Sequence, residues 1–479
     1  MIAPGGEVAD GLGNGTVHAV LSVALVVGYV VVLTLVAVRA RAAREYAEFS
    51  LARRALPLAL IFGSLCATYV GAVFSIGFVG RGFQSGFLFF FIGLAYSLQN
   101  VLVGILIAPR LRALSDCHTL GDVIGQRYNG TCHVLAGIIS VGLCTGFAAV
   151  MAKAGGVVLN DVFGLPPWSS VTIVVGITTL YTATGGLRAS VITDAFQFTA
   201  FAILLPIVLL VSLAFHLEGG SAAFMEQAAT ATRDAVGSMS CVEIIGLLTA
   251  FFLGETLIPP YANRALASET TRVARNGFVL GGLFSIIWFL IMVSLGIVAR
   301  GAIAGGTDED RVLLNLVKTI MPTEGYVLLL VVTVSIIMSS LDSLLNAGAV
   351  AFTQDIVRPL RRVPDVAALD VGRAATIIIA VAAAAGAVAV PTLIKGLLIC
   401  YTVWAPAILP ALVLGLWLRR PRPLAGILSM VIGAVVALAW QFLWADKTGI
   451  PAIIPALVAA LLAYLFGHFF GTSEGEKNE

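Results

Sequence analysis

The side chains best suited to chemistry lie in one long apolar stretch, at about residues 324–348. Ser339, Asp342 and Ser343 are spaced i, i+3 and i+4, so on a helix they share one face, and Ser340 lies beside them. A carboxylate inside a membrane-length apolar stretch is costly to bury and indicates a functional site. Hydroxyl and carboxylate oxygens are hard ligands that suit Na⁺, although serine hydroxyls also bond back to the preceding helical turn.

A second carboxylate, Asp194, lies just inside another apolar stretch, after a tight turn predicted at Gly185–Gly186. Two interpretations stay open for it. It caps a helix at the membrane surface, or it joins Asp342 in binding a cation.

Two other apolar stretches carry signs of a helix break. In one, the polar pair Thr68–Tyr69 lies within a predicted break at Ala67–Gly71. In the other, Gly254 and the pair Pro259–Pro260 interrupt the stretch, with Glu255 close by. In lipid, a broken helix is tolerated where it lines a cavity or faces protein. Breaks at corresponding places in two halves of a chain predict a transport site near the membrane midplane.

The composition shows which elements must position these groups. The chain has 479 residues, of which 59% are hydrophobic and 11% charged, with a mean hydropathy of +1.01. Soluble domains have about 25% charged residues, so a soluble enzyme is excluded, as is a disordered chain. The balance of 28 basic and 26 acidic residues argues against nucleic acid as a partner. The six cysteines and five histidines are scattered, which argues against a structural or catalytic metal site.

Thirteen apolar stretches predict an all-α polytopic membrane protein in the lipid bilayer, because a span needs about 20 apolar residues. Most lysines and arginines fall in the breaks after odd-numbered stretches, which predicts the N-terminus outside and the C-terminus inside a bacterial-type inner membrane. The stretches lie at about 17–38, 55–79, 87–108, 134–160, 169–184, 190–214, 240–258, 277–299, 324–348, 372–390, 395–418, 424–444 and 452–470.

Several function classes are disfavoured. No P-loop motif and no large loop is present, so ATP does not drive transport, and an ion gradient must do so. No HExxH or GxSxG motif supports an enzyme. A channel would need a continuous polar pore, whereas the polar groups here are few and clustered. The segment MIAPGGEVADGLGNG lacks the features of a signal peptide, and we expect a retained tail.

Three motifs carry a resemblance to a known family. GGLRASVITDAFQF at 185–198, PPYANRALASE at 259–269 and SSLDSLLNAGAVAFTQDI at 339–356 resemble motifs of the sodium/solute symporter family. This family includes the sodium–glucose, proline, pantothenate and sialic acid carriers. Asn263 and Glu269 depart from the family's usual Gln and Lys. The resemblance extends over residues 17–470.

The resemblance implies a leucine-transporter-type fold with two inverted repeats of five helices. These are expected at 53–215 and 239–418, with a tail and first helix at 1–52 and two additional helices and a cytoplasmic tail at 419–479.

The resemblance also implies two sodium sites. The main site uses the carbonyls of Ala67, Val70 and Ile336 with the hydroxyls of Ser339 and Ser340. The residue spacing alone had selected the two serines but not the carbonyls. A second site, present in some members, would use Asp194, Ser339, Asp342 and Ser343.

The expected substrate cavity lies between the two breaks. Its candidate residues are Thr68, Tyr69, Phe74, Lys153, Phe251, Gly254, Glu255, Tyr401 and Trp404. Glucose-type carriers have a Gln-containing motif where this chain has Val73 and Phe74, which disfavours a sugar. Choline carriers have a tryptophan where this chain has Ile258, which weakens a cationic cage.

Lys153 is the one basic residue inside an apolar stretch, and three roles stay open for it. It snorkels outward, it pairs with Glu255, or it binds a substrate carboxylate. The third role predicts an organic acid or an amino acid as the solute.

Together these features predict a secondary transporter that couples Na⁺ to uptake of a small organic solute by alternating access, with a monomer sufficient for function. The alternative is a proton-coupled symporter of the same fold, in which Asp194 and Asp342 carry the proton.

Overall fold

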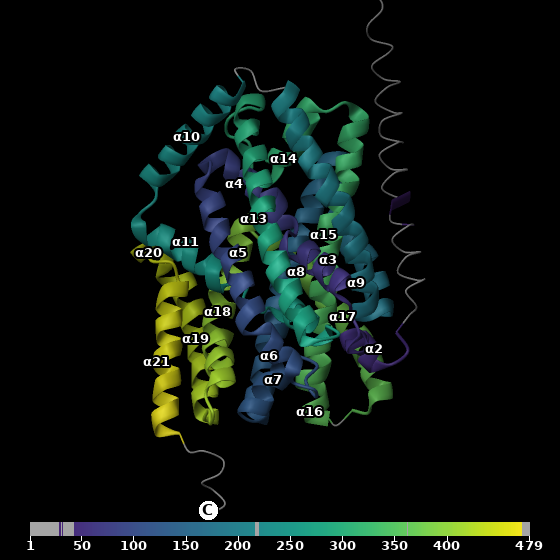
Figure 1. The fold of residues 1–479 in the computed structure, drawn as a ribbon, viewed down its shortest axis with the longest axis vertical. Helices are drawn as coiled ribbons and strands as arrows, with labels where there is room; N and C mark the ends of the chain where they lie inside the picture. Colours follow the sequence, from purple (N-terminus) through teal and green to yellow (C-terminus); the bar gives the residue numbers. More distant parts are fainter. Residues whose placement is uncertain (1–27, 30, 32–42, 216–219, 362, 472–479) are drawn as a thin grey trace, which may run out of the picture.

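The computed structural model describes residues 28, 29, 31, 43–215, 220–361 and 363–471. Over these residues the chain is helical apart from one isolated β-bridge between Leu56 and Ser268, which confirms the predicted all-α class. Most of the long helices run side by side along one axis, and α19 and α21 pack together at one edge of the bundle (Figure 1). The N-terminal tail and most of the stretch predicted at 17–38 lie outside the described residues.

The first half of the chain forms eight described helices. They are α2 (Tyr46–Leu51), α3 (Leu58–Tyr69), α4 (Phe78–Ser85), α5 (Leu88–Leu106), α6 (Ala108–Ala113), α7 (Leu120–Arg127), α8 (Gly130–Phe163) and α9 (Pro167–Phe215). A 3-10 turn η1 (Ala52–Arg54) follows α2, and a π-helical segment η2 (Val73–Gly77) precedes α4.

The second half contains the remaining helices. They are α10 (Gly220–Ser238), α11 (Cys241–Leu253), α12 (Pro259–Ala267), α13 (Thr271–Ala302), α14 (Val312–Ile320), α15 (Thr323–Ala351), α16 (Arg358–Arg361), α17 (Asp365–Gly386), α18 (Leu393–Trp417), α19 (Pro423–Leu443), α20 (Ala445–Thr448) and α21 (Ile453–Phe470). Three short segments join them: η3 (Glu309–Arg311), η4 (Phe352–Val357) and η5 (Ala387–Ala389).

Within the described ranges, nine helices are long and apolar enough to cross a membrane, or up to eleven if each bent pair is one span. The bent pairs are Leu58–Tyr69 with Val73–Ser85, at 55°, and Gly220–Ser238 with Cys241–Leu253, at 108°. Residues 301–323, between two of the predicted apolar stretches, contain the buried helix α14. Its apolar side chains pack against α13 and α15, a tertiary effect that sequence length alone does not reveal.

Helix α9 joins two of the predicted stretches and changes direction at Gly186. Its 49 residues would make a rod of about 74 Å, more than twice the hydrocarbon thickness of about 30 Å. Gly186 has φ 60° and ψ −161°, a conformation that only glycine adopts readily. A Cβ at this position would lie 2.6 Å from the Cα of Phe49 in α2. The predicted turn at Gly185–Gly186 therefore divides α9 and seats α2 against it.

Helix α15 forms the centre of the bundle. In the apolar 18-residue window of residues 325–361, 89% is buried. In the corresponding window of α21, at the edge of the bundle, 33% is buried. Helix α15 packs against α3, α8, α9, α12 and α17, so residues from several parts of the chain meet at its surface. A polar residue on α15 is therefore enclosed by protein.

We expect Gly186→Ala to lower the free energy of unfolding by about 1–3 kcal/mol or more, because the added Cβ is strained and meets Phe49. Gly176→Ala in the same helix is the control, since nothing lies within 4 Å of the added carbon. Thermal unfolding of the purified protein in detergent measures both. Equal midpoints for the two variants would contradict this account of the turn.

Candidate functional site

The first helix break lies between α3 and η2. Helix α3 ends at Tyr69, and the amide of Gly71 donates to the carbonyl of Thr68 at 3.4 Å. This bond spans three residues where an α-helical bond spans four, so the Gly71 amide no longer donates to the carbonyl of Ala67. The carbonyl of Val70 accepts from the hydroxyl of Ser75 at 2.6 Å. The predicted break is therefore observed, and it directs backbone oxygens away from the helical pattern.

Ser340 of α15 lies against this break. A Cβ on Gly71 would overlap the Ser340 hydroxyl oxygen, so the two segments touch at this point. Ser340 is 3% exposed, and its hydroxyl has no hydrogen-bond partner among the described residues. Ile336, one turn earlier on α15, is fully buried. A buried hydroxyl without a partner is unusual in a folded protein, and it leaves an oxygen available to a cation.

Ser339 faces a different group from its neighbour Ser340. Its hydroxyl donates to the Oδ1 atom of Asp194 at 2.6 Å. The sequence predicted both serines for the main sodium site. In the structure Ser340 faces the break in α3–η2, and Ser339 joins the main-site region to a carboxylate cluster.

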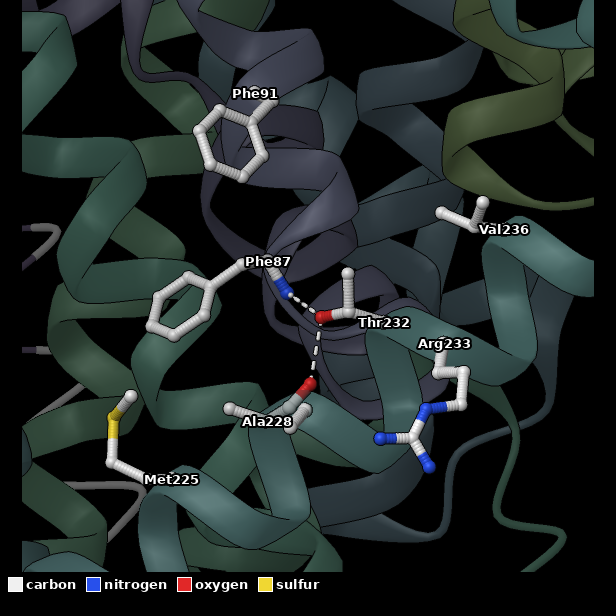
Figure 2. A pocket seen from close by; sticks show the side chains of 8 residues that line it. Phe87, Phe91, Met225, Ala228, Thr232, Arg233 and Val236 are labelled. Carbon is white, nitrogen blue, oxygen red and sulfur yellow. Dashed lines mark hydrogen bonds between the residues drawn. The ribbon is translucent and has the colours of Figure 1, made fainter.

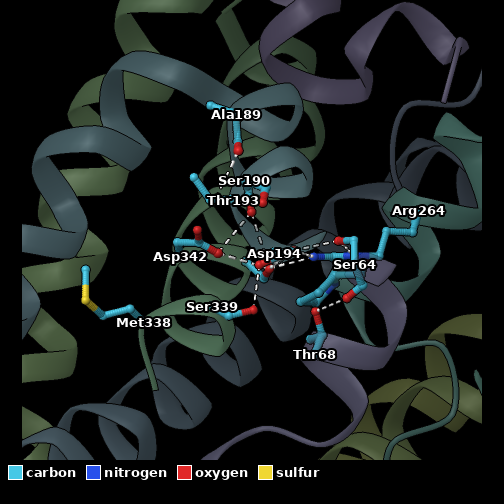
Figure 3. Close-up of polar contacts among 12 residues, drawn as sticks. Ser64, Thr68, Ala189, Ser190, Thr193, Asp194, Arg264, Met338, Ser339 and Asp342 are labelled. Carbon is cyan, nitrogen blue, oxygen red and sulfur yellow. Dashed lines mark hydrogen bonds and ion pairs between the residues drawn. The ribbon is translucent and has the colours of Figure 1, made fainter. Parts of the chain in front are cut away.

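Asp194 is the centre of that cluster, which is drawn in Figure 3. Its Oδ2 atom accepts from the Ser64 hydroxyl at 2.5 Å and from the Arg264 guanidinium at 2.8 Å. The Ser343 hydroxyl lies 3.5 Å from the same oxygen. Helices α3, α9, α12 and α15 thus meet at one fully buried carboxylate, which excludes the interpretation of Asp194 as a surface cap.

Arg264 is the main group that the sequence analysis missed, because its position between the apolar stretches at 240–258 and 277–299 indicates an inner loop. It is fully buried in α12. Its guanidinium donates to Asp194, Ser64 at 2.7 Å, Ser343 at 2.6 Å and the carbonyl of Pro260 at 2.9 Å. The chain after the second break turns back into the protein as a short helix, so the arginine must find its counter-charge inside.

Asp342 completes the cluster without a cationic hydrogen-bond partner. Its Oδ1 atom accepts from the hydroxyls of Ser190 at 2.9 Å and Ser343 at 3.1 Å. Its Oδ2 atom is buried and has no hydrogen-bond partner in the described chain. Two buried carboxylates and one guanidinium leave one negative charge, which a cation or a proton must balance. The four residues predicted for a second sodium site are thus brought together, with Arg264 among them.

The second helix break lies between α11 and α12. Leu257 within it has a positive φ of 51°, and α12 begins at Pro259. Two residues of α18 hold the break in place. The Tyr401 hydroxyl donates to the Glu255 carboxylate at 2.9 Å, and the Trp404 indole donates to the carbonyl of Thr256 at 3.0 Å.

A small cavity of about 20 Å³ lies between the two breaks. Of the predicted cavity residues, Thr68, Phe74 and Glu255 line it, and so does Ser340 from the expected ion site. The full lining is Thr68, Gly71, Val73, Phe74, Phe147, Met151, Glu255, Ile258, Ser340, Leu344 and Leu397.

The other predicted cavity residues lie behind this lining. Phe251 and Tyr401 pack edge to face with ring centroids 5.9 Å apart. Gly254 lies against the Tyr401 ring. Tyr69 packs edge to face on Tyr261, 4.6 Å between centroids, and does not line the cavity.

Lys153 lies away from the cavity lining. Its ammonium donates to the carbonyls of Val390 at 2.8 Å and Pro391 at 3.0 Å, just after η5. The predicted pairing with Glu255 is therefore wrong in this structure. The lysine charge is held by carbonyls at the end of a helix, where cations are favoured.

Two further features lie apart from the ion cluster. An apolar hollow of about 450 Å³ lies between α10 and residues Phe87 and Phe91 (Figure 2). There the Thr232 hydroxyl accepts from the Phe87 amide at 3.0 Å and donates to the Ala228 carbonyl at 2.6 Å, which holds α10 to the turn before α5.

The second feature is a cluster of one histidine and two aspartates, although the histidines are scattered in the sequence. His133 lies 2.9 Å from Asp355 and 3.2 Å from Asp122, and the three offer ligand atoms within 4.8 Å of one another. His133 and Asp355 share a hydrogen bond, and the Thr119 hydroxyl donates to Asp355 and accepts from the Asp122 amide, so the cluster joins α7, α8 and η4. Sequence spacing missed it because the residues are far apart in the chain.

Comparison with known proteins identifies the class. A sequence model of the sodium:solute symporter family matches residues 49–433, and the chain belongs to this family. Its members are transporters, so the chain is a multi-pass membrane transporter and not an enzyme. Membership supports Na⁺-coupled symport.

Individual relatives are distant. The sodium/glucose cotransporter 2 of Rattus norvegicus is 26% identical, over 82% of this chain and 66% of that protein, just under two thirds of its length. The sodium/pantothenate symporter of Escherichia coli is 25% identical, over 81% of this chain and 83% of that protein.

Solved structures support the leucine-transporter-type fold. A Na⁺-coupled sialic acid symporter has a TM-score of 0.84 at 15% identity, covering 94% of this chain and 98% of that chain. The transporter MhsT in complex with L-phenylalanine has a TM-score of 0.55 at 14% identity, covering 85% of this chain and 97% of that one. At these identities the likeness concerns the fold alone.

We expect Arg264→Gln to destabilise the protein by about 3–5 kcal/mol, because it leaves Asp194 buried without its guanidinium partner. The double variant Arg264→Gln with Asp194→Asn should be more stable than the single arginine variant, since the unpaired charge is then removed. Thermal unfolding measures both, with the exposed Arg233→Gln as control. An Arg264→Gln variant as stable as this control would show that the pair does not hold the helices together.

Proposed function

We propose that the protein is a secondary symporter in which Na⁺ binds between the first helix break and α15 and drives uptake of a small organic solute. The observation that carries this proposal is the buried, unpartnered hydroxyl of Ser340 against the break at Gly71. Carbonyls of Ala67, Val70 and Ile336 with the hydroxyls of Ser339 and Ser340 make the main site. Five neutral oxygens bind a monovalent ion without requiring a compensating carboxylate.

The cluster at Asp194 supports a second cation. Arg264 already neutralises Asp194, so the additional charge belongs to Asp342. We assign the second Na⁺ to Asp342 with the hydroxyls of Ser339 and Ser343 and, when Arg264 moves aside, Asp194. In the proton-coupled alternative, Asp342 takes a proton in place of this ion.

The proposed architecture follows the family resemblance. Thirteen spans with the N-terminus outside and the C-terminus inside suit the basic residues of the sequence. Two inverted repeats, at 53–215 and 239–418, would rock against each other around the two breaks to give alternating access. A bacterial-type inner membrane and a monomeric transport unit complete the proposal.

The driving force is adequate for such a cycle. One Na⁺ crossing 100 mV contributes about 2.3 kcal/mol, and each tenfold accumulation of solute requires about 1.4 kcal/mol. The cavity of about 20 Å³ is too small for an organic solute, so the repeats must separate before binding. The expectation of an acidic substrate depended on Lys153, and its contacts with Val390 and Pro391 remove that support.

Replacing Ser339 and Ser340 together by alanine should raise the Na⁺ concentration for half-maximal uptake by about tenfold or more, because two ligands are lost. Na⁺-dependent uptake in proteoliposomes measures this change. Thr333→Val is the matched control, since its hydroxyl bonds back to the Leu329 carbonyl of the same helix. Unchanged Na⁺ dependence in the double variant would remove the main-site assignment.

Asp342→Asn should lower the Hill coefficient for Na⁺ from about two to about one, because one of two ion sites is lost. Asp342 is the better residue to replace, because neutralising Asp194 would leave Arg264 without its counter-charge. Uptake at fixed pH, with Na⁺ replaced stepwise by K⁺, provides the measurement. A wild-type coefficient of one, together with a pH dependence that Asp342→Asn abolishes, would favour the proton-coupled alternative.

A further inference from the structure

Glu255 is a buried carboxylate at the wall of the central cavity. It is 3% exposed and lies in the break between α11 and α12, four residues before the start of the latter at Pro259. It lines the same cavity as Thr68 and Ser340, so a solute held there would lie between Glu255 and the proposed main ion site.

A tyrosine hydroxyl holds this carboxylate. Tyr401 donates to Glu255 at 2.9 Å. The hydroxyls of Tyr96 and Tyr261 lie 3.1 Å from each other. An ionised carboxylate only accepts hydrogen bonds, and the donating Tyr401 hydroxyl matches that requirement.

No cation of the described chain pairs with Glu255. None of the ion pairs between described residues includes it. Arg264 binds Asp194, and Lys153, a predicted partner of Glu255, binds two carbonyls. A buried ionised carboxylate is stable when a positive charge accompanies it, and here the protein does not supply that charge.

Aromatic rings lie near the carboxylate. Phe74 and Phe147 line the cavity together with Glu255, and Phe251 and Tyr401 pack against these two rings. Ring centroids are 5.8 Å apart for Phe147 and Tyr401 and 6.1 Å apart for Phe74 and Phe251. Ring faces attract an ammonium group within about 6 Å, and the attraction increases when water is excluded.

We propose that Glu255 binds the positively charged nitrogen of the transported solute, so that the substrate is an organic ammonium compound, which includes the ammonium group of an amino acid. This inference rests on the proposed Na⁺-coupled symport, and it replaces the acidic substrate expected from Lys153. The carboxylate supplies the counter-charge, the Tyr401 hydroxyl fixes its orientation, and the phenylalanine rings enclose the ammonium group. The neutral ligands of the proposed main Na⁺ site do not compete for the same charge.

The experiment uses the purified full-length protein in detergent and measures thermal stabilisation by small solutes in Na⁺ and in K⁺. A panel of primary, secondary and quaternary ammonium solutes is compared with neutral isosteres, such as choline with dimethylbutanol and ethanolamine with propanol. Small carboxylates such as propionate form the anionic arm. We expect Na⁺-dependent stabilisation by at least one ammonium solute and by none of the neutral isosteres or carboxylates.

Glu255→Gln should then weaken binding of that ammonium solute by about tenfold or more, while stabilisation by Na⁺ alone is retained. Glu255→Asp keeps the charge and should keep the preference for the ammonium solute over its isostere. Glu226→Gln, an exposed residue of α10, is the matched control.

The outcomes separate this inference from the proposed function. If neutral or anionic solutes stabilise the wild-type protein in Na⁺ and ammonium solutes do not, the inference is wrong and Na⁺ coupling stands. If ammonium binding is unchanged in Glu255→Gln, the inference is also wrong. If Na⁺ neither stabilises the protein nor affects binding of any solute, the proposed function itself fails.

Discussion

The ion pair between Arg264 and Asp194 is the interaction on which the centre of the molecule depends. Both side chains are fully buried, and their oxygens and nitrogens reach α3, α9, α12 and α15. Charges in such surroundings are tolerated when they are paired and hydrogen-bonded. The pair therefore fixes how four helices from distant parts of the chain meet, and it determines which other charges at the centre remain without a partner.

Two helix breaks adjoin α3 and α12, two of the helices that this ion pair connects. The first releases the Ala67 carbonyl from the helical pattern and brings Gly71 against Ser340 of α15, and the second places Glu255 and Thr256 against α18. Each break leaves backbone groups that a membrane helix would otherwise satisfy internally, and a packed neighbour must accommodate them. The Ser75 hydroxyl bonds the Val70 carbonyl at the first break, and the Trp404 indole bonds the Thr256 carbonyl at the second. The cavity between the breaks joins the proposed ion site to the proposed solute site.

Three buried carboxylates at the centre of the molecule differ in their partners. Asp194 has a guanidinium, Asp342 has hydroxyls, and Glu255 has a tyrosine hydroxyl and an aromatic enclosure. A mobile cation suits the second, and a solute with a positive charge suits the third. The coupling of ion and solute then has an electrostatic basis, because each brings a charge that the folded protein lacks. Membership of the sodium:solute symporter family is consistent with such a division.

The sequence by itself determined the features that depend on local properties. Apolar length and charge content indicated an all-helical membrane protein, glycine and proline located the breaks near Gly71 and Pro259, and helical spacing grouped Ser339, Asp342 and Ser343. Contacts between distant segments were decided by the tertiary structure alone. Arg264 lies 70 residues from Asp194 in the chain, and Lys153 lies more than 230 from the carbonyls that hold it. Side-chain direction at such sites depends on which helices become neighbours, and hydropathy and spacing contain no information about that choice.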